Sequence, residues 1–217
     1  RNSTAQANYT VAVSPSVETV RAMELGRTVH FTPQTPGEVS VFTFALSERT
    51  LAHFDSLTNS ANHLWTLDGP TGRIVDGRRF DRSDAGTSPT PVMLLEPGNY
   101  RLSVSHDLGG LSPFQFALMD LTAAQVVDTA TVISGQHAPT TINHLYRFQG
   151  KPGQQFFFDV LQVSQANQFR YRLVDPYGNV LFTRSSLADF ESEPVLAEGL
   201  YTLLIEPLIS VAAEHSY

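Results

Sequence analysis

The stretch EPGNYRLSV, at residues 96–104, and the stretch AEGLYTLLI, at residues 197–205, follow one pattern. Each places an acidic residue and a glycine just before a tyrosine, and a run rich in apolar residues follows. Glycine permits a tight turn, and short runs of this kind are typical of strands. The pattern predicts a turn and a strand in both places. We expect Tyr100 and Tyr201 to bury their rings and to bond their hydroxyl groups to the backbone.

Three further landmarks recur in the same order before these stretches. They are VFTFAL and LYRFQG (41–46 and 145–150), HFDSL and FFDVL (53–57 and 157–161), and ANHLWTLDGPTG and ANQFRYRLVDPYG (61–72 and 166–178). Similarity at several ordered landmarks indicates a repeated structural unit, and chance similarity among strand-rich sequences is the alternative. In the last landmark, Asp68 and Asp175 are expected to open turns, in which Gly72 and Gly178 adopt a positive φ.

The remaining sequence predicts an all-β protein. Short β-branched or aromatic segments alternate with turn clusters such as TPQTPGE, at residues 32–38, and KPGQ, at residues 151–154. No segment sustains a helical apolar period, although residues 15–25 and 123–133 are ambiguous. Strands this short need a second sheet to cover their apolar face. The sequence therefore predicts two tandem antiparallel β-sandwich modules, similar to jelly rolls.

The repeat also predicts where the modules begin and end. Residues 1–20 are interpreted as the last strand of an upstream repeat plus a connection, residues 21–122 as the first module, and residues 123–217 as the second. The second module is expected to lack its final strand, because SPFQFALMDL, at residues 112–121, has no counterpart after the second copy. Its open sheet edge would then accept residues 9–13 of a neighbouring molecule by strand addition.

Composition excludes several classes of protein. A net charge of −7 argues against a nucleic-acid partner, since such proteins need a basic face, and against docking on anionic membranes. No apolar run reaches the roughly 18 to 20 residues that span a bilayer. The absence of cysteine excludes disulfides, thiolate metal sites and cysteine nucleophiles. Because the chain begins at Arg1 without a methionine, we interpret it as a segment of a longer protein.

The matched landmarks resemble the bacterial pre-peptidase C-terminal domain (PPC), whose pattern is Y-x-F, then L-x-L-x-D-x-x-G, then G-x-Y-x-L-x-V. Here the pattern appears as LYRF, YRLVDPYG and GLYTLLI, and as VFTF, LWTLDGPTG and GNYRLSV. The resemblance implies a β-sandwich of a large exported protein, outside the cell or at its surface, in a non-catalytic accessory role. It does not extend to the acidic residues that the family has before the second strand, where Asn62 and Asn167 stand.

No catalytic motif is present. The seven histidines are scattered, and H-E-x-x-H, G-x-S-x-G, phosphate-binding and dinucleotide fingerprints are all missing. Ser105, His106 and Asp107 have the residue types of a catalytic triad, but neighbours on a strand point in different directions and cannot form the relay. We therefore predict that the segment is not an enzyme and needs no cofactor, with calcium as the one candidate metal.

A calcium site is the one metal site that the sequence suggests. Asp76, Asp81 and Asp84 gather in the polar stretch DGRRFDRSDAG, at residues 76–86, and carboxylate oxygens suit calcium. The spacing matches no EF-hand, and three arginines lie among the carboxylates. A solvated loop with local ion pairs is the alternative reading.

Trp65, the only tryptophan, is the candidate for ligand contact. If Leu64 matches Tyr171, then Trp65 aligns with Arg172 and faces outward, with His63 on the same face. An outward aromatic ring could stack on a sugar or a peptide. In the competing register Trp65 fills the core, and packing between modules is a third use.

These observations favour a spacer or interaction segment of an exported multidomain protein, engaged in adhesion or protein binding. Its partners would be the neighbouring modules of the same protein, and a glycan or protein ligand. The principal alternative is a carbohydrate-binding module attached to a secreted hydrolase or peptidase. The connection at residues 120–135 contains no proline run and no glycine–serine tract, so we expect the modules to be held in place rather than freely tethered.

Overall fold

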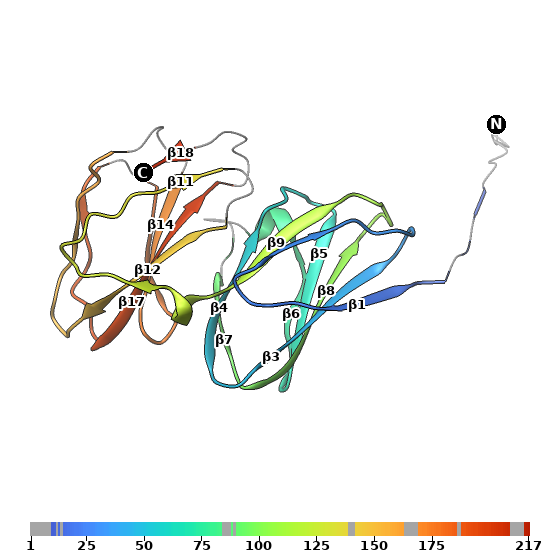
Figure 1. The fold of residues 1–217 in the computed structure, drawn as a ribbon, viewed down its shortest axis with the longest axis horizontal. Helices are drawn as coiled ribbons and strands as arrows, with labels where there is room; N and C mark the ends of the chain where they lie inside the picture. Colours follow the sequence, from blue (N-terminus) through green and yellow to red (C-terminus); the bar gives the residue numbers. More distant parts are fainter. Residues whose placement is uncertain are drawn as a thin grey trace, which may run out of the picture.

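The computed structural model describes residues 10, 11, 13, 15–83, 88, 90–138, 142–162, 169–185, 188–208 and 215–217. Their regular structure consists of β-strands and two short 3₁₀ helices, η1 (Phe80–Arg82) and η2 (Leu121–Ala123). The all-β class predicted from the sequence is therefore confirmed (Figure 1). We call residues 18–123 the first half and residues 124–217 the second half.

The first half contains two sheets. The first sheet has the strand order β1-β3-β8-β5-β6, and the second has the order β2-β9-β4-β7. The strands are β1 (Glu18–Ala22), β2 (Thr28–Phe31), β3 (Val39–Leu46), β4 (Thr50–Ser56), β5 (His63–Gly69), β6 (Gly72–Arg79), β7 (Val92–Leu95), β8 (Gly98–His106) and β9 (Phe114–Asp120). All pairs are antiparallel except β1 with β3, which is parallel.

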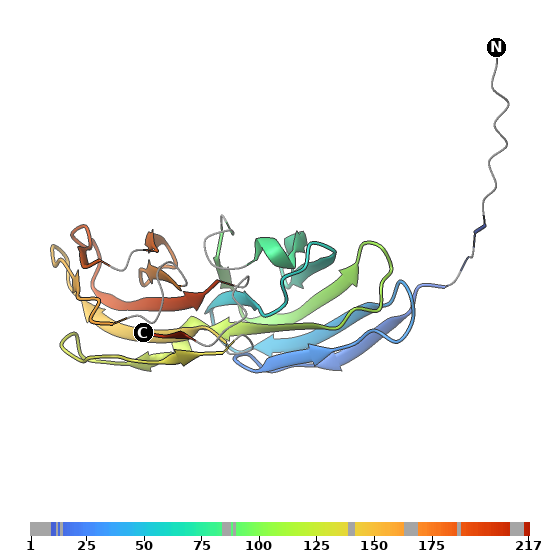
Figure 2. The same ribbon diagram turned by 90° about the horizontal axis from the view of Figure 1, so that it is seen from above.

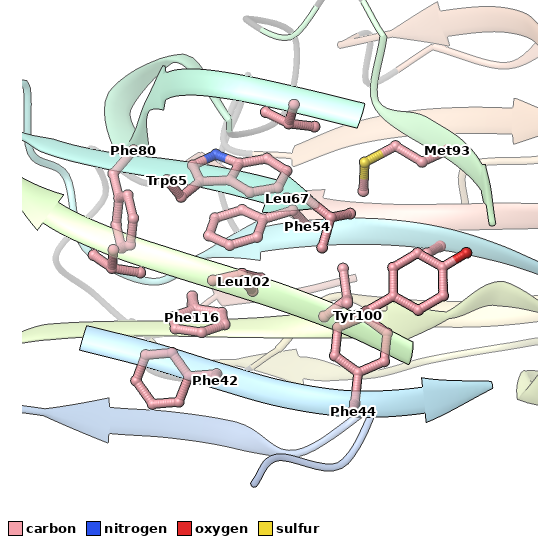
Figure 3. Close-up of a cluster of buried hydrophobic side chains, with 14 of the residues drawn as sticks. Phe42, Phe44, Phe54, Trp65, Leu67, Phe80, Met93, Tyr100, Leu102 and Phe116 are labelled. Atoms are coloured by element: carbon pink, nitrogen blue, oxygen red, sulfur yellow. The ribbon is translucent and has the colours of Figure 1, made fainter. Parts of the chain in front are cut away.

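One hydrophobic core joins these two sheets. Phe42 and Leu102 reach it from the first sheet, and Phe54 and Phe116 reach it from the second (Figure 3). The alternation of side chains along each strand directs every second residue toward this layer. Full burial of each such side chain contributes about 1.5–3 kcal/mol, so the layer is the main source of stability in this half.

The second half repeats the first sheet. Its strands β10 (Gln125–Val126), β12 (His144–Gly150), β17 (Gly199–Pro207), β14 (Phe169–Val174) and β15 (Val180–Arg184) lie in the order β10-β12-β17-β14-β15. Corresponding strands therefore lie in the same order as in β1-β3-β8-β5-β6, and the pair of β10 with β12 is again parallel. A separate core lies beneath this sheet and includes Phe148, Leu173 and Tyr201.

In the described part of the second half, the remaining strands form two separate pairs in place of one second sheet. Strand β11 (Gln136–His137) pairs with β18 (His215–Ser216), and β13 (Phe157–Phe158) pairs with β16 (Phe190–Glu191). In the first half, β4 pairs with both β7 and β9, whereas in the described part of the second half β13 pairs with β16 alone. Strand β18 pairs with β11 in the way that β9 pairs with β2. The pairing of β18 with β11 extends over two residues, and that of β9 with β2 over four.

The N-terminal expectations have mixed outcomes. Strand β1 crosses the boundary expected between residues 20 and 21, because it adds to the first sheet beside β3. Of the stretch expected to supply an exchanged strand, Tyr9 and Ala12 lie outside the described residues. Val11 and Val13 have exposed side chains and no strand assignment, so strand addition stays a prediction.

The turn tyrosines lie as the sequence predicts. Both rings are buried, and the hydroxyl of Tyr100 donates to the carbonyl of Glu96 at 2.5 Å. The hydroxyl of Tyr201 donates to the carbonyl of Ala197 at 2.8 Å. These hydrogen bonds fix each strand to the turn before it. Tyr100 and Tyr201 therefore occupy equivalent positions, from which residues of the two halves can be matched.

Candidate functional site

The structure places Trp65 inside the first half. Its side chain is 0% exposed and stacks on Phe54, with ring centroids 4.0 Å apart and an interplanar angle of 6° (Figure 3). The indole Nε1 donates a hydrogen bond to Ser83 Oγ at 2.7 Å. The outward orientation expected from the sequence is therefore wrong, and the competing register is the one observed. A ring buried in this way offers no face to a sugar or a peptide.

A single inserted residue explains the error in register. Trp65 pairs with Val104, and Tyr171 pairs with Ile205, the same number of residues after the turn tyrosine in each half. Trp65 thus corresponds to Tyr171. The second half contains an additional residue, Val174, before its turn, and the strand register shifts between β14 and β15 at that point. Alignment on the turn aspartates misses this bulge and slips the strand by one residue.

His63 is also a core residue. Its Nε2 lies 3.2 Å from the carbonyl oxygen of Ser112, and its Nδ1 lies 2.8 Å from Ser60 Oγ. Because the carbonyl can only accept, Nε2 carries the proton, and the Ser60 hydroxyl donates to Nδ1. Burial lowers the pKa of His63, so the ring is neutral at pH 7. The residue anchors the start of β5 and does not lie on a ligand-binding surface.

The aspartates proposed for calcium are engaged with arginines where the structure describes them. Asp76 Oδ1 lies 2.9 Å from Arg73 Nη1, and Asp81 accepts two hydrogen bonds from Arg79, at 3.0 and 2.6 Å. Asp84 lies outside the described residues. Among the residues that are described, no group of three or more histidines and carboxylates is arranged to hold a metal ion. The calcium site stays a prediction.

The adjacent Ser105, His106 and Asp107 do not form a relay. His106 Nδ1 accepts hydrogen bonds from the backbone N–H groups of Leu108 and Gly110, at 3.2 and 3.0 Å. The carboxylate of Asp107 lies 4.0 Å from this nitrogen, too far for the hydrogen bond that orients a catalytic histidine. The arrangement closes a turn after β8 and offers no activated nucleophile.

A second group of polar rings lies in the core of the second half. The ring centroids of His137 and His144 are 4.0 Å apart. His144 Nδ1 is hydrogen-bonded to the Tyr217 hydroxyl, whose oxygen lies 2.9 Å from the Tyr146 hydroxyl oxygen. Burial lowers the pKa of His137 to about 4 and raises the pKa of Tyr217. Both groups are neutral at pH 7, so neither offers a charged contact to a ligand at that pH.

The most distinctive site is the contact between the two halves. The outer face of the second sheet of the first half packs against the outer face of β14 and β17, and the halves lie next to each other along the molecule (Figures 1 and 2). A hydrophobic cluster spans this contact. It consists of Ala117, Met119, Leu121, Val174 and Leu204, with Leu51, Val92, Ile142 and Leu145 packed around them.

The Asp175–Gly178 turn fits closely against the first half. Asp175 Oδ1 accepts hydrogen bonds from the N–H groups of Tyr177 and Asn179, which confirms its predicted role in the turn. Gly178 has a φ of +92°, and a Cβ added there would lie 2.7 Å from Leu51 Cδ2. Glycine is therefore required both for the turn and for the close approach of the two halves.

A buried ion pair lies beside this cluster. Arg172 Nη1 lies 3.2 and 3.1 Å from the two carboxylate oxygens of Glu206, and the exposed fractions of the two side chains are 2% and 0%. Arg172 was expected on an outer ligand-binding face. Its side chain does lie on the outer face of β14, but the first half covers it.

Strand β4 of the first half adds His53 and Asp55 to this ion pair, and we call the four residues His53, Asp55, Arg172 and Glu206 the charge network. His53 Nε2 lies 3.2 Å from Glu206 Oε1 and 3.1 Å from Asn143 Nδ2, and His53 Nδ1 lies 2.9 Å from the carbonyl oxygen of Pro91. Asp55 accepts a hydrogen bond from the backbone N–H of Asn143 at 2.8 Å. The pairs His53–Glu206 and Asp55–Asn143 therefore connect the halves directly.

The protonation of His53 is set by these neighbours. Burial acts to lower its pKa, but the hydrogen bond and the charge of Glu206, with a further contribution from Asp55, outweigh burial, and the pKa is raised. A protonated His53 gives the network two cations, with Arg172, and two anions. The buried charges then balance within the contact.

Sequence reasoning did not single out His53, Asp55, Asn143 or Glu206, although one signal was present. In the first half, the strand YRLSVSH alternates apolar and polar residues after Tyr100. In the second half, the equivalent YTLLIEP carries apolar residues on both faces. A strand that is apolar on both faces is buried on both faces, and the first half covers the outer one here.

Comparison with known proteins yields structural matches only. No family model and no curated protein matches the chain. Among solved structures, the pre-peptidase C-terminal domain of a Bacillus anthracis collagenase is 14% identical, with a TM-score of 0.36, and covers 49% of this chain and 99% of its own. The CUB1-EGF-CUB2 segment of human MASP-1/3 is 9% identical, with a TM-score of 0.25, and covers 87% and 98%. Tandem CBM51 modules of a Streptococcus pneumoniae family 98 glycoside hydrolase are 9% identical, with a TM-score of 0.23, and cover 89% and 83%. All three scores are below 0.5.

The residues that the sequence suggested for ligand contact do not form a common surface. Among the described residues, no helix is long and apolar enough to cross a membrane. The residues proposed for ligand contact, Trp65, His63 and Arg172, do not come together at a surface, because all three are buried and the last lies in the other half. The contact between the halves is the site on which a functional proposal can be based.

Proposed function

We propose that the chain is a pair of β-sandwich modules, at residues 21–122 and 123–217, held at a fixed angle. The pair acts as a non-catalytic spacer or interaction segment of an exported multidomain protein, outside a bacterial cell or at its surface. The observation that carries this proposal is the buried charge network joining His53 to Glu206 and Arg172. The bacterial and extracellular setting rests on the sequence motifs alone.

The energetics of this contact support a fixed angle. Contacts between domains of one chain are commonly polar and allow relative motion unless they are large and hydrophobic. Here an apolar cluster lies beside the buried pair of Glu206 and Arg172. Removing one partner of such a pair costs about 3–5 kcal/mol, because the other charge stays buried without a partner. Bending at this joint would break the network, so the modules resist it.

The two halves differ on the face that makes this contact. Leu204 and Arg172 lie on the outer face of the second half, where the strand pairing places Ser103 and Thr66 in the first half. The first half therefore presents a polar surface at the equivalent position. This difference supports a joint that is specific to this pair of modules and not a contact that any two copies would form.

The carbohydrate-binding alternative loses its stacking platform. That reading depended on an outward Trp65, whose ring the structure places in the core. The spacer function keeps its support, since it depends on the contact between the halves and not on a ligand-binding face.

Spin-label distances test the fixed angle. The chain contains no cysteine, so labels on Asp107→Cys and Lys151→Cys, exposed positions in different halves, report only the distance between the halves. We expect one narrow distance distribution, as narrow as that of a control pair within the first half, Glu48→Cys with Asp107→Cys. A broad distribution for the first pair beside a narrow one for the control would refute the spacer function as proposed.

A further inference from the structure

We propose that the contact between the halves is a pH-sensitive joint, which holds the modules together at mildly acidic pH and releases them as the pH rises. The device is the group formed by His53, Glu206, Arg172 and Asp55. The inference rests on the proposed function, because it describes how the fixed angle between the modules would be regulated.

The hydrogen-bond partners of His53 identify the proton that changes. Its Nδ1 faces the carbonyl oxygen of Pro91, which can only accept, so Nδ1 carries a proton in both charge states. Its Nε2 lies 3.2 Å from Glu206 Oε1 and 3.1 Å from Asn143 Nδ2, and because the amide nitrogen only donates, a proton on Nε2 is directed to Glu206. The proton on Nε2 is therefore the one that is gained and lost, and it is also the one that bonds to the other half.

Charged groups face His53 from three strands. They are Glu206 on β17, Asp55 on its own strand β4, and Arg172 on β14, which contacts Glu206. Asn143 and the Pro91 carbonyl are the uncharged neighbours. With His53 protonated, two positive charges balance two negative charges. Without that proton, Glu206 keeps the Arg172 guanidinium, but Glu206 and Asp55 both lose the positive charge of His53.

Loss of the Nε2 proton also brings two lone pairs together. The Nε2 atom and Glu206 Oε1 would then face each other at a distance that only a shared proton makes favourable. Separation of the halves relieves this repulsion, because both groups become hydrated. The protonation of His53 and the docking of the halves are therefore coupled.

The sign of the pH dependence follows from this coupling. The pKa of His53 is raised in the docked state, whereas a hydrated histidine in separated halves has a pKa of about 6.5. The contribution of His53 to docking is therefore complete below about pH 6.5, and it is lost as the pH rises through the docked-state pKa. Between these two pKa values the docking equilibrium weakens by up to tenfold for each pH unit.

The same spin-label pair tests this proposal across a pH range of about 5.5 to 9.5, which brackets the ordinary pKa of histidine. In the otherwise unchanged protein we expect a narrow distance distribution below about pH 6.5 and a progressively broader one as the pH rises above it. His30→Gln, which removes an exposed histidine that belongs neither to the hydrophobic cluster nor to the charge network, should leave this transition in place. In His53→Gln we expect the width of the distribution not to change with pH.

A direct titration keeps the test decisive if His53→Gln undocks the halves at every pH. In the isotope-labelled protein, the ring carbon signals of His53 should titrate with a midpoint above about pH 6.5. In Glu206→Gln, this midpoint should fall by about one pH unit or more, which is a tenfold or larger loss of proton affinity. A narrow distribution at every pH with a His53 midpoint below about 6.5 would overturn the joint while leaving the spacer function intact. A broad distribution at every pH would instead refute the spacer function.

Discussion

We expect Trp65→Ala to lower the free energy of unfolding by about 3 to 5 kcal/mol, the range for removal of a large buried aromatic side chain. The substitution leaves a cavity against Phe54 and also leaves the Ser83 hydroxyl without the indole donor. Urea denaturation followed by circular dichroism measures the loss, since the fluorescent residue itself is removed.

Two further variants make the result specific. Trp65→Phe keeps an aromatic ring on Phe54 and loses the hydrogen bond to Ser83 with part of the volume, so we expect a smaller loss than for alanine. Tyr177→Ala, at an exposed position, should change stability by no more than about 0.5 kcal/mol. If Trp65→Ala cost as little as Tyr177→Ala and abolished binding to a glycan, the core role of Trp65 would be wrong.

The second large effect is expected from Glu206→Ala. Removal of this carboxylate leaves the buried Arg172 guanidinium and His53 imidazole without the anion that contacts both of them, at a cost of about 3–5 kcal/mol. The halves avoid that cost by separating, so we expect the spin-label distribution between them to broaden. Within each half the strands keep their own cores, and the thermal unfolding of the chain should split into two transitions.

A compensated variant separates loss of charge balance from loss of packing. Glu206→Leu combined with Arg172→Met removes both charges and keeps similar volumes, which is commonly neutral or stabilising at buried ion pairs. His53 can then stay neutral, donating to the Pro91 carbonyl and accepting from Asn143. We expect this double variant to dock, whereas Glu193→Ala, at an exposed position, should behave like the unchanged protein. Equal behaviour of Glu206→Ala and Glu193→Ala would show that the network does not hold the halves together.

The local features of the fold could be predicted from the sequence because short-range chemistry specifies them. A glycine and a tyrosine in a fixed relation predicted the bond from the Tyr100 hydroxyl to the Glu96 carbonyl, and the same bond in the second half. An aspartate followed by a glycine predicted the turn that Asp175 caps. Each of these depends on residues within one turn or one strand.

The register of β14 could not be predicted from the landmarks alone. Val174 adds one residue to the strand before its turn, and only the pairing with β17 shows which residues face the core. A slip of one residue exchanges the two faces of a strand, so Trp65 was assigned to the wrong one. Strand β1 was likewise not predicted, because the expected boundary at residue 20 divided it between a connection and the first module, and nothing local indicates a parallel partner.

The contact between the halves depends on residues far apart in the chain. His53 and Glu206 meet only because two sheets stack through their outer faces, and no periodicity within either strand encodes that meeting. The apolar outer face of YTLLIEP indicates that something covers this strand, but it does not identify the cover. The charge network is thus a property of the assembled pair.

The two sandwich modules are proposed to dock through the outer faces of β4, β7, β9, β14 and β17. Residual dipolar couplings of the backbone amides, measured in one alignment medium at about pH 6.5, where His53 is protonated, test this docking most directly. We expect couplings from residues 18–123 and from residues 124–207 each to fit their own half and to yield alignment tensors of the same magnitude and orientation. Tensors that differ in magnitude or orientation would show halves that move independently, and the docked pair would be contradicted.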